Sequence, residues 1–136
     1  MPTVALRFSP LAEHVRTARP VAVSVARRAG FVEGQLDEIR IAIGEACGRA
    51  VGHDGTSGPV GFVDMELCDD HDRLDVTVVQ CDLEGRPLSA PVHDLDPLST
   101  ALMEGMADSS SVGTGAPALQ LSWSLHGTAQ GVPLST

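Results

Sequence analysis

The segment Leu36–His53 constrains the fold more than any other part of the chain. Its apolar residues recur three or four positions apart, which is the spacing of one face of an α-helix. Asp37 and Glu38 come in the first turn, where the helix dipole favours negative charge. Glycine and polar residues follow and end the pattern. A helix is predicted from about Leu36 to Val51, with these residues on its apolar face: Ile39, Ile43, Ala46, Cys47, Ala50 and Val51.

Glu45 and Arg49 are the charged residues in the second half of this helix. They are four positions apart, so they are neighbours on the helix surface. Taken by itself, this spacing indicates a solvated ion pair that stabilises the helix by about 0.3–0.5 kcal/mol.

Composition indicates one acidic globular domain. The chain has 136 residues and a formal net charge of −9, and arginine supplies all nine basic residues. This length suits a single core. The negative charge argues against a nucleic-acid surface, which needs clustered basic residues. Neither a membrane span nor a signal segment is recognisable, so we expect no membrane partner and a cytoplasmic protein.

The cysteines and histidines do not suggest a metal site. Cys47, Cys68 and Cys81 lack the spacing of metal ligands and leave one cysteine unmatched. Cys47 falls on the apolar helix face, and the other two fall in segments typical of strands. We expect three reduced thiols and no metal ligands among them.

The remaining periodicity predicts an order of strands and helices. Pro20 lies inside the first helical pattern and is expected to kink or split it. We assign residues 1–126 to a single domain and residues 127–136 to a flexible C-terminal tail. The predicted elements are a strand at 3–8, a helix at 11–29, the helix at 36–51, a hairpin of strands at 60–67 and 74–79, a long loop at 81–97, a helix at 98–107 and a strand at 118–125.

The central helix resembles the signature helix of the anti-sigma-factor serine/threonine kinases, small bacterial members of the GHKL ATPase superfamily. The residues that carry the resemblance are Asp37, Glu38, Ile39, Ala42, Glu45, Ala46, Cys47, Ala50, Val51 and His53. The resemblance implies the histidine-kinase-like ATPase fold, an α/β (α+β) two-layer sandwich. In that fold, helices cover one face of a mixed, mostly antiparallel sheet.

The resemblance also implies a chemistry for this helix. Glu45 matches the glutamate that acts as general base on the serine of a partner protein. Arg49 occupies the position of an asparagine that ligates the magnesium ion of ATP. Magnesium requires oxygen ligands, whereas a guanidinium offers only donors and a positive charge. Arg49 is therefore expected to exclude magnesium, or to grip a triphosphate directly without metal.

Two further nucleotide-binding segments of the family depart from their pattern here. Strand phase puts Gln80 where the family has an adenine-binding aspartate, and a shifted alignment uses Asp82 instead. Gly85 is the glycine of this segment, and neither alignment recovers both glycines of the family. The glycine-rich phosphate segment lacks its glycines, although Ser99 or Thr100 could cap the following helix.

The predicted function follows from a retained framework with altered nucleotide-binding segments. We predict a non-catalytic or weakly catalytic anti-sigma-factor-like protein that acts by partner switching, binding a sigma factor, a STAS-domain anti-sigma-factor antagonist, or both. A homodimer is compatible with the resemblance. The alternative is an active serine kinase that phosphorylates the STAS-domain antagonist, and a third interpretation is a domain that binds another small ligand. No cofactor is expected, except ATP and Mg²⁺ if the ancestral site survives.

Overall fold

The computed structural model describes residues 3–51, 60–70, 72–89, 97–111 and 118–125. Within them the chain forms the following elements in order: β1 (Thr3–Phe8), α1 (Ala12–Ala29), α2 (Glu33–Val51), β2 (Phe62–Asp70), β3 (Arg73–Cys81), α3 (Pro97–Met106), β4 (Ser109–Ser111) and β5 (Ala118–Ser124). No helix in these residues is long and apolar enough to cross a membrane.

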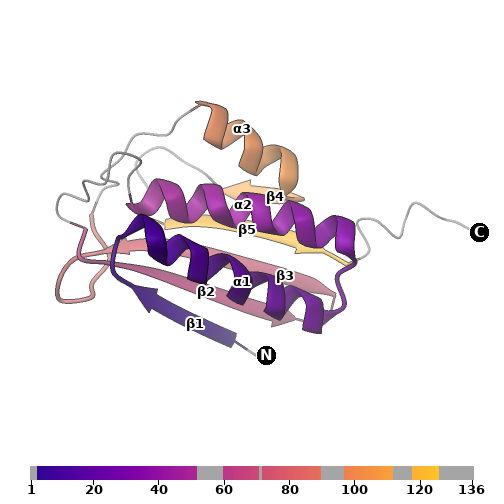
Figure 1. The fold of residues 1–136 in the computed structure, drawn as a ribbon, viewed down its shortest axis with the longest axis horizontal. Coiled ribbons are helices and arrows are strands. Elements are labelled where there is room, and N and C mark those ends of the chain that lie inside the picture. Colours follow the sequence, from indigo (N-terminus) through magenta and orange to yellow (C-terminus); the bar gives the residue numbers. More distant parts are fainter. Residues whose placement is uncertain (1–2, 52–59, 71, 90–96, 112–117, 126–136) are drawn as a thin grey trace, which may run out of the picture.

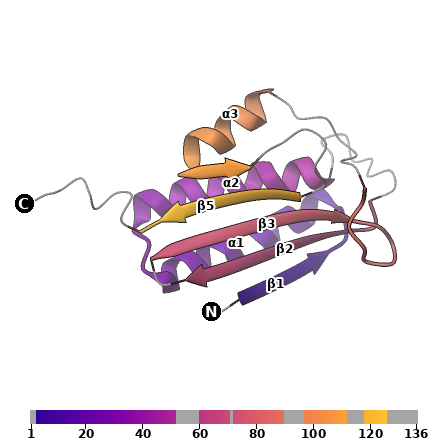
Figure 2. The ribbon, with the colours of Figure 1, turned by 180° about the vertical axis from the view of Figure 1, so that it is seen from behind.

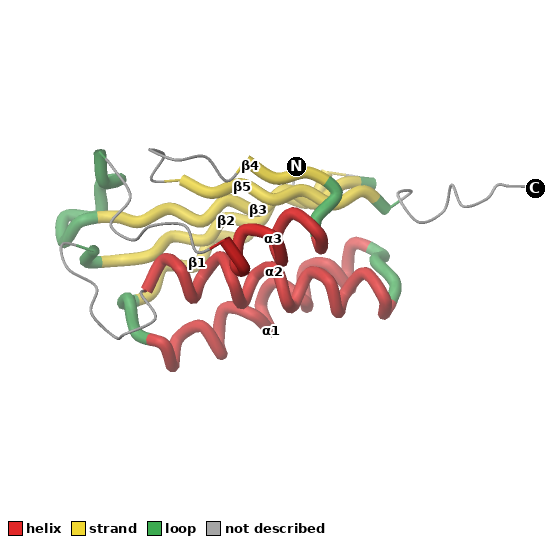
Figure 3. Tube along the Cα trace, turned by 90° about the horizontal axis from the view of Figure 1, so that it is seen from above, coloured by secondary structure: helices red, strands yellow, loops and turns green. Residues whose placement is uncertain are grey.

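The strands form one five-stranded sheet in the order β1-β2-β3-β5-β4, and every described strand pair is antiparallel. The helices lie together on one face of this sheet, so that the fold has one layer of helices and one layer of strands (Figures 1 and 3). Figure 2 shows the strands in front of the helices, so no described helix covers the other face. The predicted two-layer fold class is confirmed.

The hairpin of β2 and β3 carries much of the core. Val63, Met65 and Leu67 alternate with more exposed residues along β2 and are fully buried. The register pairs Met65 with Val78 and Leu67 with Val76, both of which are also buried. Since alternate residues of a strand share one face, this phase directs one face of each strand into the core beneath the helices.

The prediction that Pro20 might split the first helix is wrong, because α1 runs from Ala12 to Ala29 as one helix. An internal proline costs about 3 kcal/mol. Burial of an apolar face that extends on both sides of the exposed Pro20 offsets this cost, since packing supplies most helix stability in proteins. The helix ends as expected at Gly30, whose φ of +106° is the left-handed conformation that glycine adopts readily.

Several boundaries differ from those expected. α2 begins at Glu33, three residues before Leu36, and the strand β4 was not predicted because three consecutive serines show no apolar alternation. The expected loop at 81–97 begins as a turn closed by a bridge between Cys81 and Pro87. Residues 90–96, His53 and the predicted tail lie outside the described residues.

Candidate functional site

Glu45 lines a groove between α1 and α2. The groove has a volume of about 490 Å³ and is lined on α1 by Arg16 and Arg19 and on α2 by Arg40, Gly44 and Glu45, among others. A second hollow of about 450 Å³ shares the three arginines and adds Arg27 farther along α1. We call the two together the arginine groove. It places the predicted general base on an accessible surface, next to positive charge.

Glycine makes room for this groove. A Cβ atom at Gly44 would lie 3.2 Å from Cδ of Arg19, so the Arg19 side chain crosses α2 where α2 has no side chain. Gly48 lines the groove one turn later, on the same side of α2. These two small residues leave space between the helices for long side chains from α1. A larger residue at position 44 would push Arg19 out of its present place.

The arginines of the groove differ in how they are neutralised. Arg40 pairs with Asp37 at 2.7 Å, and Arg27 pairs with Glu33 at 3.3 Å. Within the described residues, no carboxylate pairs with Arg16 or Arg19. Among the described residues, the groove therefore holds two arginines without a salt bridge and one carboxylate, that of Glu45, on a chain whose net charge is −9. Such a surface attracts an acidic group of a partner.

Arg49 is not part of this groove. The predicted ion pair between Glu45 and Arg49 is wrong, because no salt bridge joins them in the described part of the chain. Glu45 lines the groove, whereas Arg49 is only 5% exposed and its Nε has no hydrogen-bond partner among the described residues. Burial lowers the pKa of Arg49, because desolvation disfavours the charged form.

The helical phase of Arg49 directs it away from α1. It stands about 100° around the helix from Gly48, in line with the buried Ala42 and Ala46 of the preceding turns. Figure 1 shows α2 lying between α1 and α3, with the first turn of α3 at the end where α2 finishes. We therefore assign Arg49 to the flank of α2 that α3 covers.

The first turn of α3 brings further unpaired polar groups into the interior. Ser99 is 1% exposed, and within the part of the chain that the structure describes, neither its hydroxyl nor that of Thr100 has a hydrogen-bond partner. The expectation that either residue caps α3 is wrong, because the helix begins earlier, at Pro97, and neither hydroxyl is bonded. Both lie in the segment for which the sequence resemblance predicts a phosphate-binding role.

Gln80, which strand phase placed at the position of the family's adenine-binding aspartate, is 1% exposed. Its Nε2 donates to the carbonyl of Ala50 at 3.2 Å. That carbonyl is one of the last four of α2, which lack a partner within the helix. Gln80 therefore ties the end of β3 to the end of α2, and one of its two amide protons is committed to this tie.

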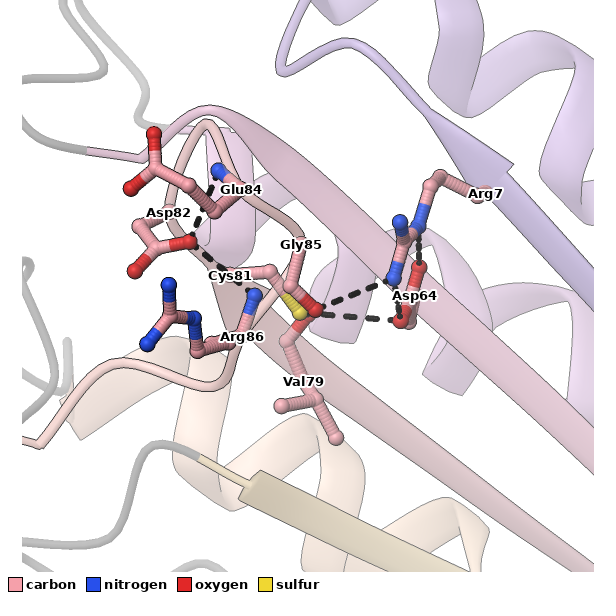
Figure 4. Close-up of polar contacts among 8 residues, drawn as sticks. All are labelled: Arg7, Asp64, Val79, Cys81, Asp82, Glu84, Gly85 and Arg86. Carbon is pink, nitrogen blue, oxygen red and sulfur yellow. Dashed lines mark hydrogen bonds and ion pairs between the residues drawn. The ribbon is translucent and has the colours of Figure 1, made fainter.

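Asp82 closes a turn with its own side chain (Figure 4). Its Oδ1 accepts hydrogen bonds from the backbone amides of Glu84 at 2.9 Å and Arg86 at 3.0 Å. The backbone N–H of Asp82 also donates to the carbonyl of Arg86 at 2.8 Å, and that of Gly85 to the carbonyl of Asp82 at 3.0 Å. This oxygen of Asp82 organises the turn.

The same turn is held against β1 by Arg7 (Figure 4). Arg7 donates to both carboxylate oxygens of Asp64, at 2.6 and 2.7 Å, and to the carbonyl of Gly85 at 3.2 Å. Gly85 has a φ of +83°, and a Cβ there would lie 2.5 Å from Nη1 of Arg7. Gly85 is thus required by the turn and by the close approach of Arg7.

Electrostatics reinforce this contact. The hydrogen bonds from Arg7 hold the pKa of Asp64 below its usual value. Burial and the neighbouring Asp64 raise the pKa of the Cys81 thiol, which donates to Asp64 Oδ2 at 3.6 Å. The thiol therefore stays protonated at neutral pH.

The structure thus divides the predicted site residues among four places. Glu45 opens to the arginine groove, Gln80 lies at the junction of β3 and α2, and Asp82 and Gly85 form a turn. Arg49 on α2 and Ser99 and Thr100 on α3 each hold a buried polar atom without a hydrogen-bond partner among the described residues. The described residues contain no group of three or more acidic, histidine or cysteine side chains that could hold a metal.

Sequence analysis missed the arginine groove. Arg16 and Arg19 are three positions apart on α1, which places them on one side of the helix, and this signal was available. The contribution of Arg40 from α2 became visible only when the two helices were placed side by side.

Comparison with known proteins agrees with this framework. The family model for the histidine kinase-like ATPase domain matches residues 8–123. The crystal structure of the RsbU and RsbW domains of Rv1364c from Mycobacterium tuberculosis matches with a TM-score of 0.64 and 15% identity, over 91% of this chain and 32% of that one. No curated protein matches the sequence. Since the family model spans most of the chain and the fold agrees, the protein belongs to the histidine kinase-like ATPase domain family.

Proposed function

We propose that this protein is a non-catalytic or weakly catalytic anti-sigma-factor-like regulator, which acts by binding partner proteins in a partner-switching mechanism. The arginine groove is the observation that carries this proposal. It presents Arg16 and Arg19, which form no salt bridge with any described residue, beside Glu45. An acidic segment of a sigma factor or of a STAS-domain antagonist would complement it. The similarity to a structure that contains an RsbW domain supports this class of partner.

The nucleotide-binding positions support the non-catalytic part of the proposal. Arg49 stands where the family has its magnesium ligand, and a guanidinium cannot coordinate a cation. One oxygen of Asp82 is committed to its turn, and one amide proton of Gln80 to Ala50. These contacts leave Mg²⁺ without its family ligand and reduce the groups free to recognise adenine.

One observation favours the alternative of an active serine kinase. Glu45 is partly exposed and opens to the groove where a partner would dock, so a serine hydroxyl could come within hydrogen-bond reach of its carboxylate. In that case, Glu45 is the general base that takes the hydroxyl proton.

The test is binding of purified sigma factors and STAS-domain proteins from the organism that encodes this chain. We expect the double change Arg16→Gln with Arg19→Gln to weaken the bound complex roughly tenfold or more, because both guanidinium groups lose their charge. Arg28→Gln is the matched control, since Arg28 lies on the same helix, is exposed and does not line the groove. Equal affinities for the double variant and the control would refute the groove as the docking surface.

Glu45→Gln separates the two functions. If the protein only binds its partner, the change removes no activity, and wild type transfers no phosphate from labelled ATP to the partner serine. Phosphorylation by wild type that disappears in Glu45→Gln would instead establish the kinase.

A further inference from the structure

The arginine groove has two walls of different chemistry. Its α1 wall carries Arg16 and Arg19 and, in the second hollow, Arg27. Its α2 wall carries Ile41, which is 44% exposed although it is a large apolar residue. The other apolar residues of the first hollow are Ala12, Val15 and Val51. A ligand that is only acidic would leave this apolar surface in contact with water.

The arginines of the α1 wall have the spacing of one helix face. Arg16, Arg19 and Arg27 are three and eight positions apart, so they span about 16 Å along α1. A second helix that lies along α1 has the same rise per residue, and its residues three, four, eight or eleven positions apart share one face. Acidic residues with this spacing would therefore meet the three arginines in turn.

The charge of the groove is available to a partner. Two of its arginines form no salt bridge with any described residue. The other two pair at the rim, Arg27 with Glu33 and Arg40 with Asp37. The side chains of Glu33 and Asp37 are 81% and 71% exposed. Ion pairs this exposed contribute little to stability, so carboxylates of a partner can replace them.

Glu45 restricts which anionic partner can dock. It is the one carboxylate among the described residues that line the groove. A uniformly anionic ligand, such as a nucleic-acid backbone or an acidic lipid surface, would place negative charge against Glu45 and against a chain of net charge −9. A protein helix can instead place a neutral or basic residue opposite Glu45.

We propose that the arginine groove binds an amphipathic, acidic helix of its protein partner. Acidic residues three or four positions apart face Arg16, Arg19 and Arg27, and an apolar residue in the adjacent row of the helix contacts Ile41. The groove between two packed helices suits such a helix, because the side-chain ridges of a third helix fit into it. This inference rests on the proposed function and adds to it the chemistry of the docking segment.

The first experiment compares three labelled peptides of about 15 residues, a length that covers the groove from Ala12 to Arg27 when helical. The first peptide has glutamates and leucines in adjacent rows of one helical face, in an alanine background. The second has the same composition in a scrambled order, and the third has alanine in place of each leucine. Fluorescence anisotropy measures their binding to the full chain. We expect the first peptide to bind at least about tenfold tighter than the other two.

Ile41→Gln tests the apolar wall. It should weaken binding of the amphipathic peptide about three- to tenfold and leave binding of the alanine peptide unchanged, because only leucine gains from covering Ile41. Val32→Gln is the matched control, since Val32 is 58% exposed and does not line the groove. The double change Arg16→Gln with Arg19→Gln should weaken binding of both peptides.

Equal binding of the ordered and scrambled peptides would overturn the proposal, because charge alone would then explain the attraction. The same conclusion would follow from no binding of the ordered peptide, from wild-type affinity in Ile41→Gln, or from tighter binding of a single-stranded oligonucleotide or of vesicles that contain an anionic lipid.

Failure of this inference can be told apart from failure of the proposed function. If any of these results is found while partner proteins still lose affinity in Arg16→Gln with Arg19→Gln, the proposed function stands and only the helical docking segment is refuted. If the peptides bind as expected but partner proteins keep their affinity in that double variant, the groove is refuted as the docking surface of the proposed function.

Discussion

Arg49→Met should stabilise the protein in the absence of ligand. In wild type the Arg49 side chain is almost fully buried, and its Nε has no hydrogen-bond partner in the described ranges of the chain. An unsatisfied buried donor costs about 1–3 kcal/mol. Methionine keeps the aliphatic stem that packs against the neighbouring helix and removes the donor together with the charge. We therefore expect the free energy of unfolding to rise by about 1–3 kcal/mol.

The assay is urea denaturation followed by circular dichroism, with a thermal melt as a second measurement. A gain of this size should raise Tm by about 3–10 °C for a chain of this length, with little change in the urea m value. Arg28→Met is the control and should stay within about 0.5 kcal/mol of wild type, because Arg28 is exposed. The measurement is made in phosphate-free buffer, since a bound anion would stabilise wild type.

The result that would refute this reasoning is a loss of more than about 1 kcal/mol in Arg49→Met. It would mean that the guanidinium makes favourable interactions in the folded protein that exceed the cost of its burial. Arg49 would then be a residue that stabilises the fold.

Three further predictions concern other contacts. Gly85→Ala should lower the free energy of unfolding by about 1–2 kcal/mol in a urea titration, because alanine is strained at the positive φ of this position. Adding Arg7→Ala to the same chain should relieve only the clash between the new Cβ and the Arg7 side chain. A Gly85→Ala variant as stable as wild type would contradict the turn geometry. Arg7 lowers the pKa of Asp64 in the folded state, so the ionised Asp64 stabilises the fold above the unfolded carboxyl pKa of about 3.9, and this stabilisation is lost as the pH falls through the lower folded value. Asp64→Asn should therefore be less stable than wild type at pH 7. Unfolding curves at pH 7 and below pH 3 should show that this difference in stability shrinks in acid. Burial raises the pKa of Cys47 to about 12. In the double variant Cys68→Ser with Cys81→Ser, the remaining thiol of Cys47 should therefore resist a thiol reagent at pH 8 and react only after denaturation. Rapid reaction of the native protein would show that Cys47 is accessible.

The fold was largely predictable because its signals are local. Alternation along β2 and β3 and the apolar spacing of α2 need only a few neighbouring residues to be recognised. The inward phase of Gln80 followed from the same alternation. The failures have equally local causes: the three serines of β4 carry no pattern, and the cost of Pro20 is offset by tertiary packing.

The candidate site was less predictable, since its properties depend on which surfaces meet. Spacing alone predicted an ion pair between Glu45 and Arg49. In the folded protein, Glu45 lies on the groove next to α1, whereas Arg49 is buried on a different flank of α2. Asp82 had the right chemistry for adenine, yet the turn it closes uses one of its oxygens. In both cases the neighbours that decide the outcome are not visible in the local pattern.

By itself, the sequence determined the order of the elements other than β4, the apolar faces, and an arginine at position 49, where the resemblance implies a metal-ligating asparagine. Periodicity and residue chemistry are properties of the chain before it folds. Only the tertiary structure decided that Arg19 and Arg40 share a groove with Glu45, and that Arg49 and Ser99 are buried without partners. Burial and charge pairing depend on segments far apart in the sequence, so they are established only when the helices pack against one another and on the sheet.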